Sequence, residues 1–242
     1  MKRSVQRVDP KATAPSTSVR GYLERIQDAG LKPVASAGPV GGSRGRLLVE
    51  AIKLFASHGF DACSVRDLAK AANLRAPAIY NHYGSKNDIL VTAVDFILTE
   101  FYEVLFTNHK TTDARSLLIE ILRRHALHGM LKQTMAKACY VVLNPDFMER
   151  VMPPKDRRRI AAAMAEYIRI LRELLDEVLG LDDEIDSTLR AMLVHDLVDQ
   201  TASRYDPKTG RTPEEEADKY VLLVTRMIGL APKPRKPELR IT

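Results

Sequence analysis

Apolar residues recur at helical spacing along most of the chain, and no stretch of useful length alternates apolar and polar residues as a half-buried strand would. Proline, glycine, aspartate or asparagine separates the periodic segments and supplies the expected breaks. The pattern predicts helices at about 44–58, 64–72, 75–82, 86–106, 113–128, 132–142, 155–179, 183–204 and 213–228. The predicted fold class is therefore all-α.

The first three predicted helices are short and follow one another closely. Gly59 suits the left-handed position that ends a helix, and Ser64 with Asp67 three positions later predicts a capped helix start. Asn73 can adopt the left-handed conformation of a tight turn. Three short helices with such a turn between the second and third have the spacing of a helix-turn-helix, whose last helix enters the DNA major groove.

Residues 1–43 are rich in Pro, Gly, Ser and Ala, and this composition predicts a mostly disordered arm. Part of the arm allows a second interpretation. Val19, Tyr22, Leu23 and Ile26 have the spacing of one apolar helix face, so a short helix docked on the body is the alternative.

Positive charge gathers in the first third of the chain. Residues 1–90 carry 14 basic and 7 acidic residues, or +7, whereas residues 91–242 carry 23 and 24, or −1. This asymmetry favours a polyanionic partner for the N-terminal part. A basic flexible tail is the alternative explanation, because residues 1–45 alone contribute +5 from 8 basic and 3 acidic residues.

Composition excludes several classes of protein. No run approaches the roughly 18 apolar residues of a membrane-spanning helix, and polar sequence follows the basic N-terminus, so we expect a cytoplasmic protein without a membrane partner. Cys63 and Cys139 lie far apart without a Cys/His cluster, which predicts neither a disulfide framework nor a metal site. No phosphate-binding glycine loop or nucleophile elbow is present, so we expect no enzyme activity and no cofactor.

A family resemblance appears within residues 44–90. It rests on Ala51-x3-Phe55-x3-Gly59-Phe60, Ser64-Val65-Arg66-Asp67-Leu68-Ala69, Ala72-Asn73-Leu74 and Ile79-Tyr80-Asn81-His82-Tyr83-Gly84-Ser85-Lys86. In element order and spacing these motifs resemble the DNA-binding region of TetR-type transcriptional repressors. Asn73, Arg75 and Pro77 stand where that family often has Gly, Ser and Gly, so the operator sequence does not carry over.

Side-chain chemistry divides the candidate DNA contacts into two groups. Side chains that can hydrogen-bond a base edge or touch a thymine methyl group are Arg66, Arg75, Ala76, Pro77, Ala78 and Asn81. Side chains suited to phosphate oxygens are Arg44, Ser64, Tyr80, His82 and Lys86. The resemblance implies the same division, with Tyr80 also facing the groove.

The resemblance implies that residues 91–230 form a helical effector-binding and dimerisation domain, followed by a basic tail at 231–242. Its pocket would lie among the middle helices and its dimer interface on the last two long helices. Flexible Met side chains suit an adaptable apolar pocket, although plain core is the alternative. The candidate pocket residues are Met130, Met135, Tyr140, Phe147, Met148, Met164 and Tyr167.

The segment 203–220 is similar to the C-terminal part of TetR-type regulators of lipid and steroid breakdown, some of which sense acyl-CoA thioesters. We therefore expect a small, largely apolar effector, such as an acyl-CoA or another lipid-like molecule. His125 and His128 suit a metal or an anion, but a solvated basic helix face is favoured because no third ligand is identifiable. The neighbouring His195 and Asp199 favour a polar cluster at the dimer interface.

Together these features predict a homodimeric repressor that leaves a palindromic double-stranded DNA operator when a small effector binds. The alternative is a DNA-binding protein of the same fold that answers to a protein partner. An apolar cavity of several hundred cubic ångströms would favour the first function, and a solid core would favour the second.

Overall fold

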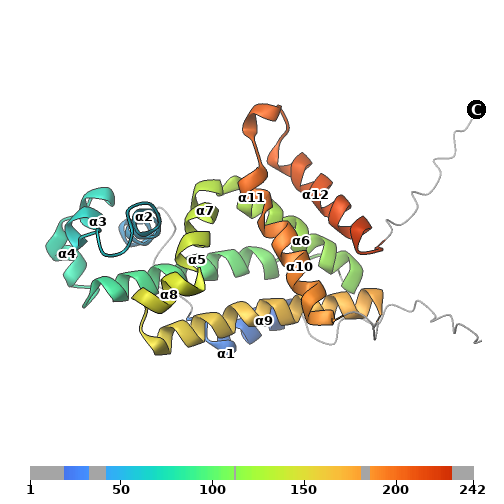
Figure 1. Cartoon of the computed structure of the whole chain (residues 1–242), viewed down its shortest axis with the longest axis horizontal. Coiled ribbons are helices and arrows are strands. Elements are labelled where there is room, and N and C mark those ends of the chain that lie inside the picture. The colour runs from blue at the N-terminus through green and yellow to red at the C-terminus, as the bar shows by residue number, and fades with distance from the viewer. Residues whose placement is uncertain (1–18, 33–41, 112, 181–185, 231–242) are drawn as a thin grey trace, which may run out of the picture.

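The computed structural model describes residues 19–32, 42–111, 113–180 and 186–230, and every regular element in these ranges is helical (Figure 1). The predicted all-α fold class is confirmed. The helices are α1 (Val19–Ala29), α2 (Ser43–His58), α3 (Val65–Ala71), α4 (Ala76–Tyr80), α5 (Lys86–Phe106), α6 (Ala114–Leu131), α7 (Gln133–Val142), α8 (Pro145–Val151), α9 (Pro154–Leu179), α10 (Ser187–Asp199), α11 (Thr201–Arg204) and α12 (Pro213–Met227), with a 3-10 turn at Pro207–Thr209. None of these helices is long and apolar enough to cross a membrane.

Helices α2, α3 and α4 form a small group at one end of the molecule (Figure 1). The predicted start of α3 is confirmed, because the Ser64 hydroxyl accepts the Asp67 amide at 3.2 Å and the Asp67 carboxylate accepts the Ser64 amide at 2.9 Å. Asn73 has a φ of 55°, as the turn between α3 and α4 requires. Phe55, Leu68, Ile79 and Tyr83 are buried between the three helices and α5.

Helix α5 leaves this group and becomes the central helix of the larger domain, where it packs against α1, α2 and α6. The larger domain also contains α9, α10 and α12. Helix α7 packs against α2, so it bridges the larger domain and the small helical group. Helix α8 makes a second link, because the Asn87 side-chain amide in the first turn of α5 donates to the Val151 main-chain oxygen at 2.6 Å.

The prediction of a mostly disordered arm is wrong for residues 19–32, where the alternative of a docked helix is confirmed. Helix α1 packs on α5 and α9 and buries Tyr22, Ile26 and Leu31. Arg25 adds ion pairs to Glu166 and Glu173 of α9. Tertiary packing and these ion pairs stabilise a helix that would be marginal in isolation. The rest of the arm, residues 1–18 and 33–41, and the predicted basic tail at 231–242 lie outside the described residues.

Two details of the helix pattern differ from prediction. The structure contains α8, which the sequence pattern does not predict because so short a periodic run is hard to recognise. Asn144 caps this helix and Pro145 occupies its first turn. The long helix predicted at 183–204 is instead α10 followed by the single turn α11. At the junction the buried Thr201 hydroxyl donates to the Val198 main-chain oxygen at 2.7 Å, competing with continuous helix geometry.

Candidate functional site

The outer side of α3 and α4 carries the side chains predicted to contact DNA. The fold brings them together because α3 packs directly against α4. The exposed members are Ser64, Arg66, Arg75, Pro77, Ala78, Tyr80, Asn81 and His82, whereas Ala76, Arg44 and Lys86 are half-buried. Tyr80, an aromatic residue at 59% exposure, is unusually open to solvent. We call the exposed side of α3, α4 and the turn after α4 the reader surface.

Local geometry explains how the short helix α4 is held. Ile79 is 1% exposed and anchors the helix in the core, while Arg75 is its extended N-cap residue with φ −87° and ψ 133°. The Arg75 side chain makes no capping hydrogen bond, and Pro77 is accommodated in the first turn. The N-terminal end of α4 therefore presents side chains outward, as insertion into a major groove requires.

Lys86 and Arg44 have structural contacts that the sequence did not reveal. The Lys86 ammonium donates to the main-chain oxygens of Phe60 and Cys63 at 2.7 and 2.9 Å and lies 4.3 Å from the Phe60 ring centroid. Arg44 Nε donates to the Tyr83 hydroxyl at 3.1 Å. Lys86 thus fixes the connection between α2 and α3. Its contact with DNA phosphates stays a prediction.

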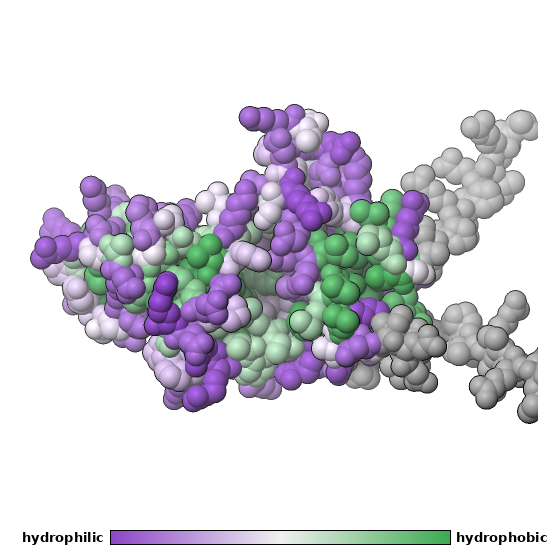
Figure 2. Space-filling model, in the orientation of Figure 1, coloured by the Kyte–Doolittle hydropathy of each residue, from purple (hydrophilic) through white to green (hydrophobic). Residues whose placement is uncertain are grey.

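The larger domain contains a cavity of about 440 Å³ between α5, α6, α7, α9 and α10. Figure 2 shows the surface hollowed near its centre, between the regions of α7 and α10. Apolar side chains supply most of its wall: Ile97, Leu98, Phe101, Met135, Leu143, Met164 and Ile168. A cavity of this size suits a small organic molecule.

Four of the predicted pocket residues line this cavity: Met135, Tyr140, Met164 and Tyr167. The other three, Met130, Phe147 and Met148, are buried in the core and do not line this cavity. Helical periodicity identifies buried side chains, but it does not distinguish a face that lines a cavity from a face that packs on a neighbouring helix.

A polar cluster lies in the cavity wall among α6, α9 and α10. His125 Nδ1 lies 3.0 Å from the Tyr167 hydroxyl oxygen, and His125 Nε2 lies 3.5 Å from Asp199 Oδ1. His195 completes the cluster, with its ring centroid 5.4 Å from that of His125. His128 also lines the cavity, and its buried Nε2 has no hydrogen-bond partner.

One sequence interpretation of these residues is corrected. His125 does not lie on a solvated face, because its side chain is buried on the same side of α6 as Leu118 and Leu122. The three-residue and seven-residue spacing from these leucines was the available signal. His195 and Asp199 line the cavity, and their place at a dimer interface stays a prediction.

Burial controls the charge of the cluster. It lowers the pKa of His125, and together with the nearby Lys132 ammonium it lowers the pKa of His128 to about 4. Burial alone would raise the pKa of the Asp199 carboxyl, but the contact with His125 outweighs it and the pKa is lowered. At neutral pH the cavity therefore contains two uncharged imidazoles beside an ionised carboxylate.

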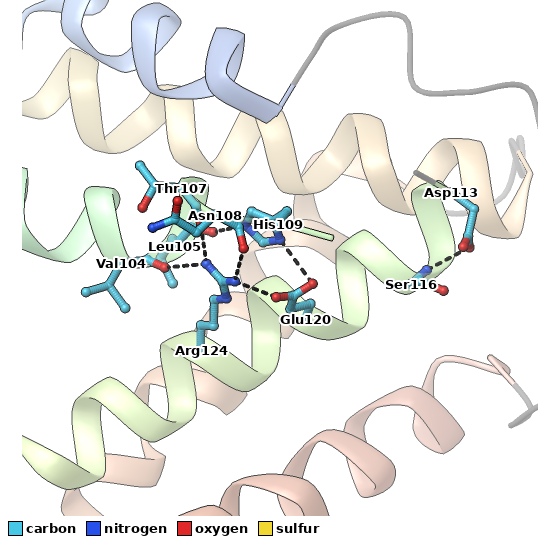
Figure 3. Close-up of polar contacts among 9 residues, drawn as sticks. All are labelled: Val104, Leu105, Thr107, Asn108, His109, Asp113, Ser116, Glu120 and Arg124. Carbon is cyan, nitrogen blue, oxygen red and sulfur yellow. Dashed lines mark hydrogen bonds and ion pairs between the residues drawn. The ribbon is translucent and has the colours of Figure 1, made fainter. Parts of the chain in front are cut away.

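A second polar network fixes the far end of α5 (Figure 3). The Arg124 guanidinium of α6 donates to the main-chain oxygens of Val104, Thr107 and Asn108. The Glu120 carboxylate accepts from Arg124 and lies 3.2 Å from His109 Nδ1. These contacts satisfy carbonyl groups at the C-terminus of α5 and join it rigidly to α6.

Large apolar side chains remain exposed on α10 and α12. They form a hydrophobic patch that Figure 2 shows in green beside these helices. Its members are Leu189, Met192, Leu193, Leu222, Leu223 and Met227. An exposed patch of this kind marks a protein contact surface, and we call it the α10–α12 patch. In the part of the chain that the structure covers, no cluster of three or more His, Cys, Asp or Glu side chains suits a metal ion.

Comparison with known proteins agrees with this architecture. Residues 47–93 match the family described as bacterial regulatory proteins, tetR family. The repressor KstR2 of Mycobacterium tuberculosis is 36% identical over 74 residues, which are 31% of this chain and 35% of that protein. This chain thus spans only about a third of the length of the curated relatives it matches.

Solved structures extend the likeness to most of the chain. The TetR-family regulator PfmR of Thermus thermophilus covers 75% of this chain and 97% of its own, with 26% identity and a TM-score of 0.57. AibR, solved in complex with isovaleryl coenzyme A and operator DNA, covers 73% and 95%, with 20% identity and a TM-score of 0.60. At that identity the likeness to AibR concerns the fold.

Proposed function

Because residues 47–93 match the tetR family of bacterial regulatory proteins and about three quarters of the chain shares the fold of a regulator of that family, we propose a homodimeric transcriptional repressor. It binds a palindromic DNA operator and leaves it when a small, largely apolar effector occupies the cavity. The reader surface is the observation that carries this proposal. Eight of the predicted DNA-contacting side chains are exposed there, from Ser64 to His82, on helices held rigidly from behind.

The electrostatics of the chain support a DNA partner. The excess positive charge lies in residues 1–90, which include the reader surface, while the rest of the chain is nearly neutral. The exposed Arg66 and Arg75 side chains suit guanine acceptors, and the exposed His82 side chain suits a phosphate. Counterion release from DNA would then provide much of the affinity.

The α10–α12 patch supports a homodimer. Leu193 and Leu223 are 55% and 56% exposed, which is costly for large aliphatic side chains in water. A two-fold axis through this patch relates two reader surfaces. The operator is then a palindrome whose half-sites are about one helical turn, or a multiple of it, apart.

The cavity supports a small-molecule effector over a protein partner. Its volume of about 440 Å³ and its mostly apolar wall suit a lipid-like molecule or the acyl part of an acyl thioester. The complex of AibR with isovaleryl coenzyme A is a precedent for such a ligand in this fold.

A contact route joins the cavity to the reader surface. Helix α7 lines the cavity with Met135, Cys139 and Tyr140 and packs against α2 on its other side. The Asn87–Val151 hydrogen bond ties α8 to the first turn of α5. An effector that favours one position of α7 and α8 therefore changes the distance between the two reader surfaces of a dimer.

Selection from a pool of random duplex DNA tests the function. The purified full-length protein should enrich one palindromic motif, and electrophoretic mobility shifts should show salt-sensitive binding to it. The variant Arg66→Ala should lose the motif preference while retaining weak binding to any duplex. The selection is carried out at low salt, which favours DNA binding by regulators of this kind. If the protein enriches no motif there, the proposal is contradicted.

A further inference from the structure

The polar end of the cavity contains mostly hydrogen-bond acceptors. With Asp199 ionised and facing His125 Nε2, the single hydrogen of the neutral His125 ring lies on Nε2. His125 Nδ1 then carries a lone pair and accepts the hydrogen of the Tyr167 hydroxyl at 3.0 Å. The Tyr167 hydroxyl has thus used its only hydrogen, and it presents lone pairs to the cavity.

The neighbouring groups add further acceptors. The Asp199 side chain keeps 43% exposure, so its carboxylate is reachable and can only accept. His195 Nδ1 donates to Asp196 Oδ1 at 3.2 Å, so this nitrogen is not available to a ligand. The Thr201 hydroxyl has given its hydrogen to the Val198 main-chain oxygen. In this cluster the unpartnered His128 Nε2 can take either role.

The charge of the cavity wall also favours a ligand that donates hydrogen bonds. Asp196 and Asp199 line the cavity, and no Lys or Arg is among the described residues that do so. A carboxylate ligand would bring a third negative charge into a partly desolvated space whose described lining contains no Lys or Arg. A ligand with only acceptor groups would leave the Asp199 and Tyr167 oxygens desolvated and unpaired.

We propose that the cavity binds a largely apolar molecule that carries a hydrogen-bond donor, a hydroxyl or an amine, and directs it at Asp199 and Tyr167. Carboxylic acids are excluded from this position, and an acyl group fits only when it bears such a donor. Aromatic and aliphatic side chains, chiefly Phe101, Met164 and Ile168, bury the apolar part. This inference rests on the cavity being the effector site of the proposed function.

Four matched probes test the proposal by isothermal titration calorimetry on the full-length protein without DNA: phenylbutanol, phenylbutylamine, phenylbutyrate and phenylbutyl methyl ether. They share the apolar part and differ in the terminal group. The alcohol and the amine should bind about tenfold or more tightly than the ether and the carboxylate. Binding of the carboxylate or the ether as tightly as the alcohol, or no binding of any probe, overturns the proposal.

Two variants locate the donor site. Asp199→Asn should weaken binding of the amine about tenfold or more and narrow its advantage over the carboxylate. Tyr167→Phe should weaken binding of the alcohol and leave the affinity for the ether unchanged. Glu149→Gln is the matched control, since it removes one acidic charge from a pair with Arg157 and Glu149 is not among the residues that line the cavity. An unchanged probe preference in both cavity variants, with their helical content retained by circular dichroism, also overturns the proposal.

The calorimetric result is independent of DNA binding. A protein that binds the alcohol but selects no operator would fail the proposed function and keep the ligand chemistry. A protein that selects an operator but treats all four probes alike would keep the function and lose this inference.

Discussion

Arg159 on α9 holds Asp95 on α5 through two parallel hydrogen bonds, from Nη1 to Oδ1 at 2.6 Å and from Nη2 to Oδ2 at 2.7 Å. The Asp95 side chain is 4% exposed, so this is a buried charge pair between the central helix and the helix beside it. Arg159 also donates to the Gly30 main-chain oxygen at 3.2 Å. One guanidinium therefore joins α5, α9 and the end of α1.

Removing this guanidinium should destabilise the protein strongly. Arg159→Ala leaves the buried Asp95 carboxylate without a cation and with only the long hydrogen bond from the Lys32 main-chain amide at 3.4 Å, and we expect a loss of about 3–5 kcal/mol in the free energy of unfolding in urea. Arg157→Ala breaks the exposed pair with Glu149 and should cost less than about 1 kcal/mol. Similar losses in the free energy of unfolding in the two variants would contradict a buried ion pair between Arg159 and Asp95.

The DNA-binding region should contain two kinds of basic residue, one on the reader surface and one at the start of α5. Arg66→Ala should cost about 1–3 kcal/mol on the selected operator and little on unrelated duplex DNA. If Lys86 contacts a phosphate, Lys86→Ala should weaken binding to all DNA duplexes alike. The substitution should then reduce the slope of log affinity against log salt concentration by about one unit. It should also lower the melting temperature, because its ammonium holds the Phe60 and Cys63 carbonyl groups.

The control for these DNA measurements is Lys219→Ala, an exposed substitution on α12 that removes the same charge far from the reader surface. It should change neither specificity nor melting temperature. Equal loss of specific and non-specific binding in Arg66→Ala would assign Arg66 to the phosphates instead of a base.

The α10–α12 patch predicts the oligomeric state. Leu193→Glu combined with Leu223→Glu should convert a dimer into a monomer in sedimentation velocity at micromolar concentration, because four charges would meet across the two-fold axis. Leu131→Glu alters an equally exposed leucine outside the patch and should leave the dimer intact. A wild-type protein that sediments as a monomer would rule out this interface.

Stability should depend on pH through the buried imidazoles. The pKa of His128 is lowered to about 4 in the folded protein, against about 6.5 in the unfolded chain, so the unfolded state binds more protons between these values. The free energy of unfolding should therefore be highest above pH 6.5 and fall as the pH decreases toward 4. His125, whose pKa is lowered by burial, contributes in the same direction.

Urea unfolding at several pH values checks this dependence. His128→Gln should reduce the fall in stability between pH 6.5 and 4, while its difference from the wild type should stay constant above pH 7. An identical slope in both proteins would show that the His128 ring is not desolvated as the structure indicates.

The parts of the fold that the sequence predicted well depend on local chemistry. The Ser64–Asp67 capping box, the left-handed Asn73 and the bounds of α5 follow from residues close together in the chain. The docking of α1 required a partner surface from α5 and α9, and the single sequence could offer it only as an alternative.

The functional site shows the same division. Exposure of Arg66, Arg75 and His82 followed from the helix-turn-helix spacing. The His125–Tyr167 contact joins residues 42 positions apart, and the Lys86 contact with Phe60 joins residues 26 apart. Helical periodicity gives no information about such pairs, so the sequence predicts a solvated face for His125 and His128 and not a cavity wall.

The direction of α1 has a practical consequence for spectroscopy. Gly30 lies against Arg159 near the start of α9, while Tyr22 lies beside Glu173 and Glu177 near its end, so α1 runs antiparallel to α9. Val19 therefore stands at the end of α9 that is remote from α8 and the reader surface (Figure 1). A fluorophore attached at residue 20, where the Arg20 side chain is 89% exposed, would leave the reader surface unobstructed. Energy transfer between two such labels in a dimer would then report the spacing of the two larger domains while DNA is bound.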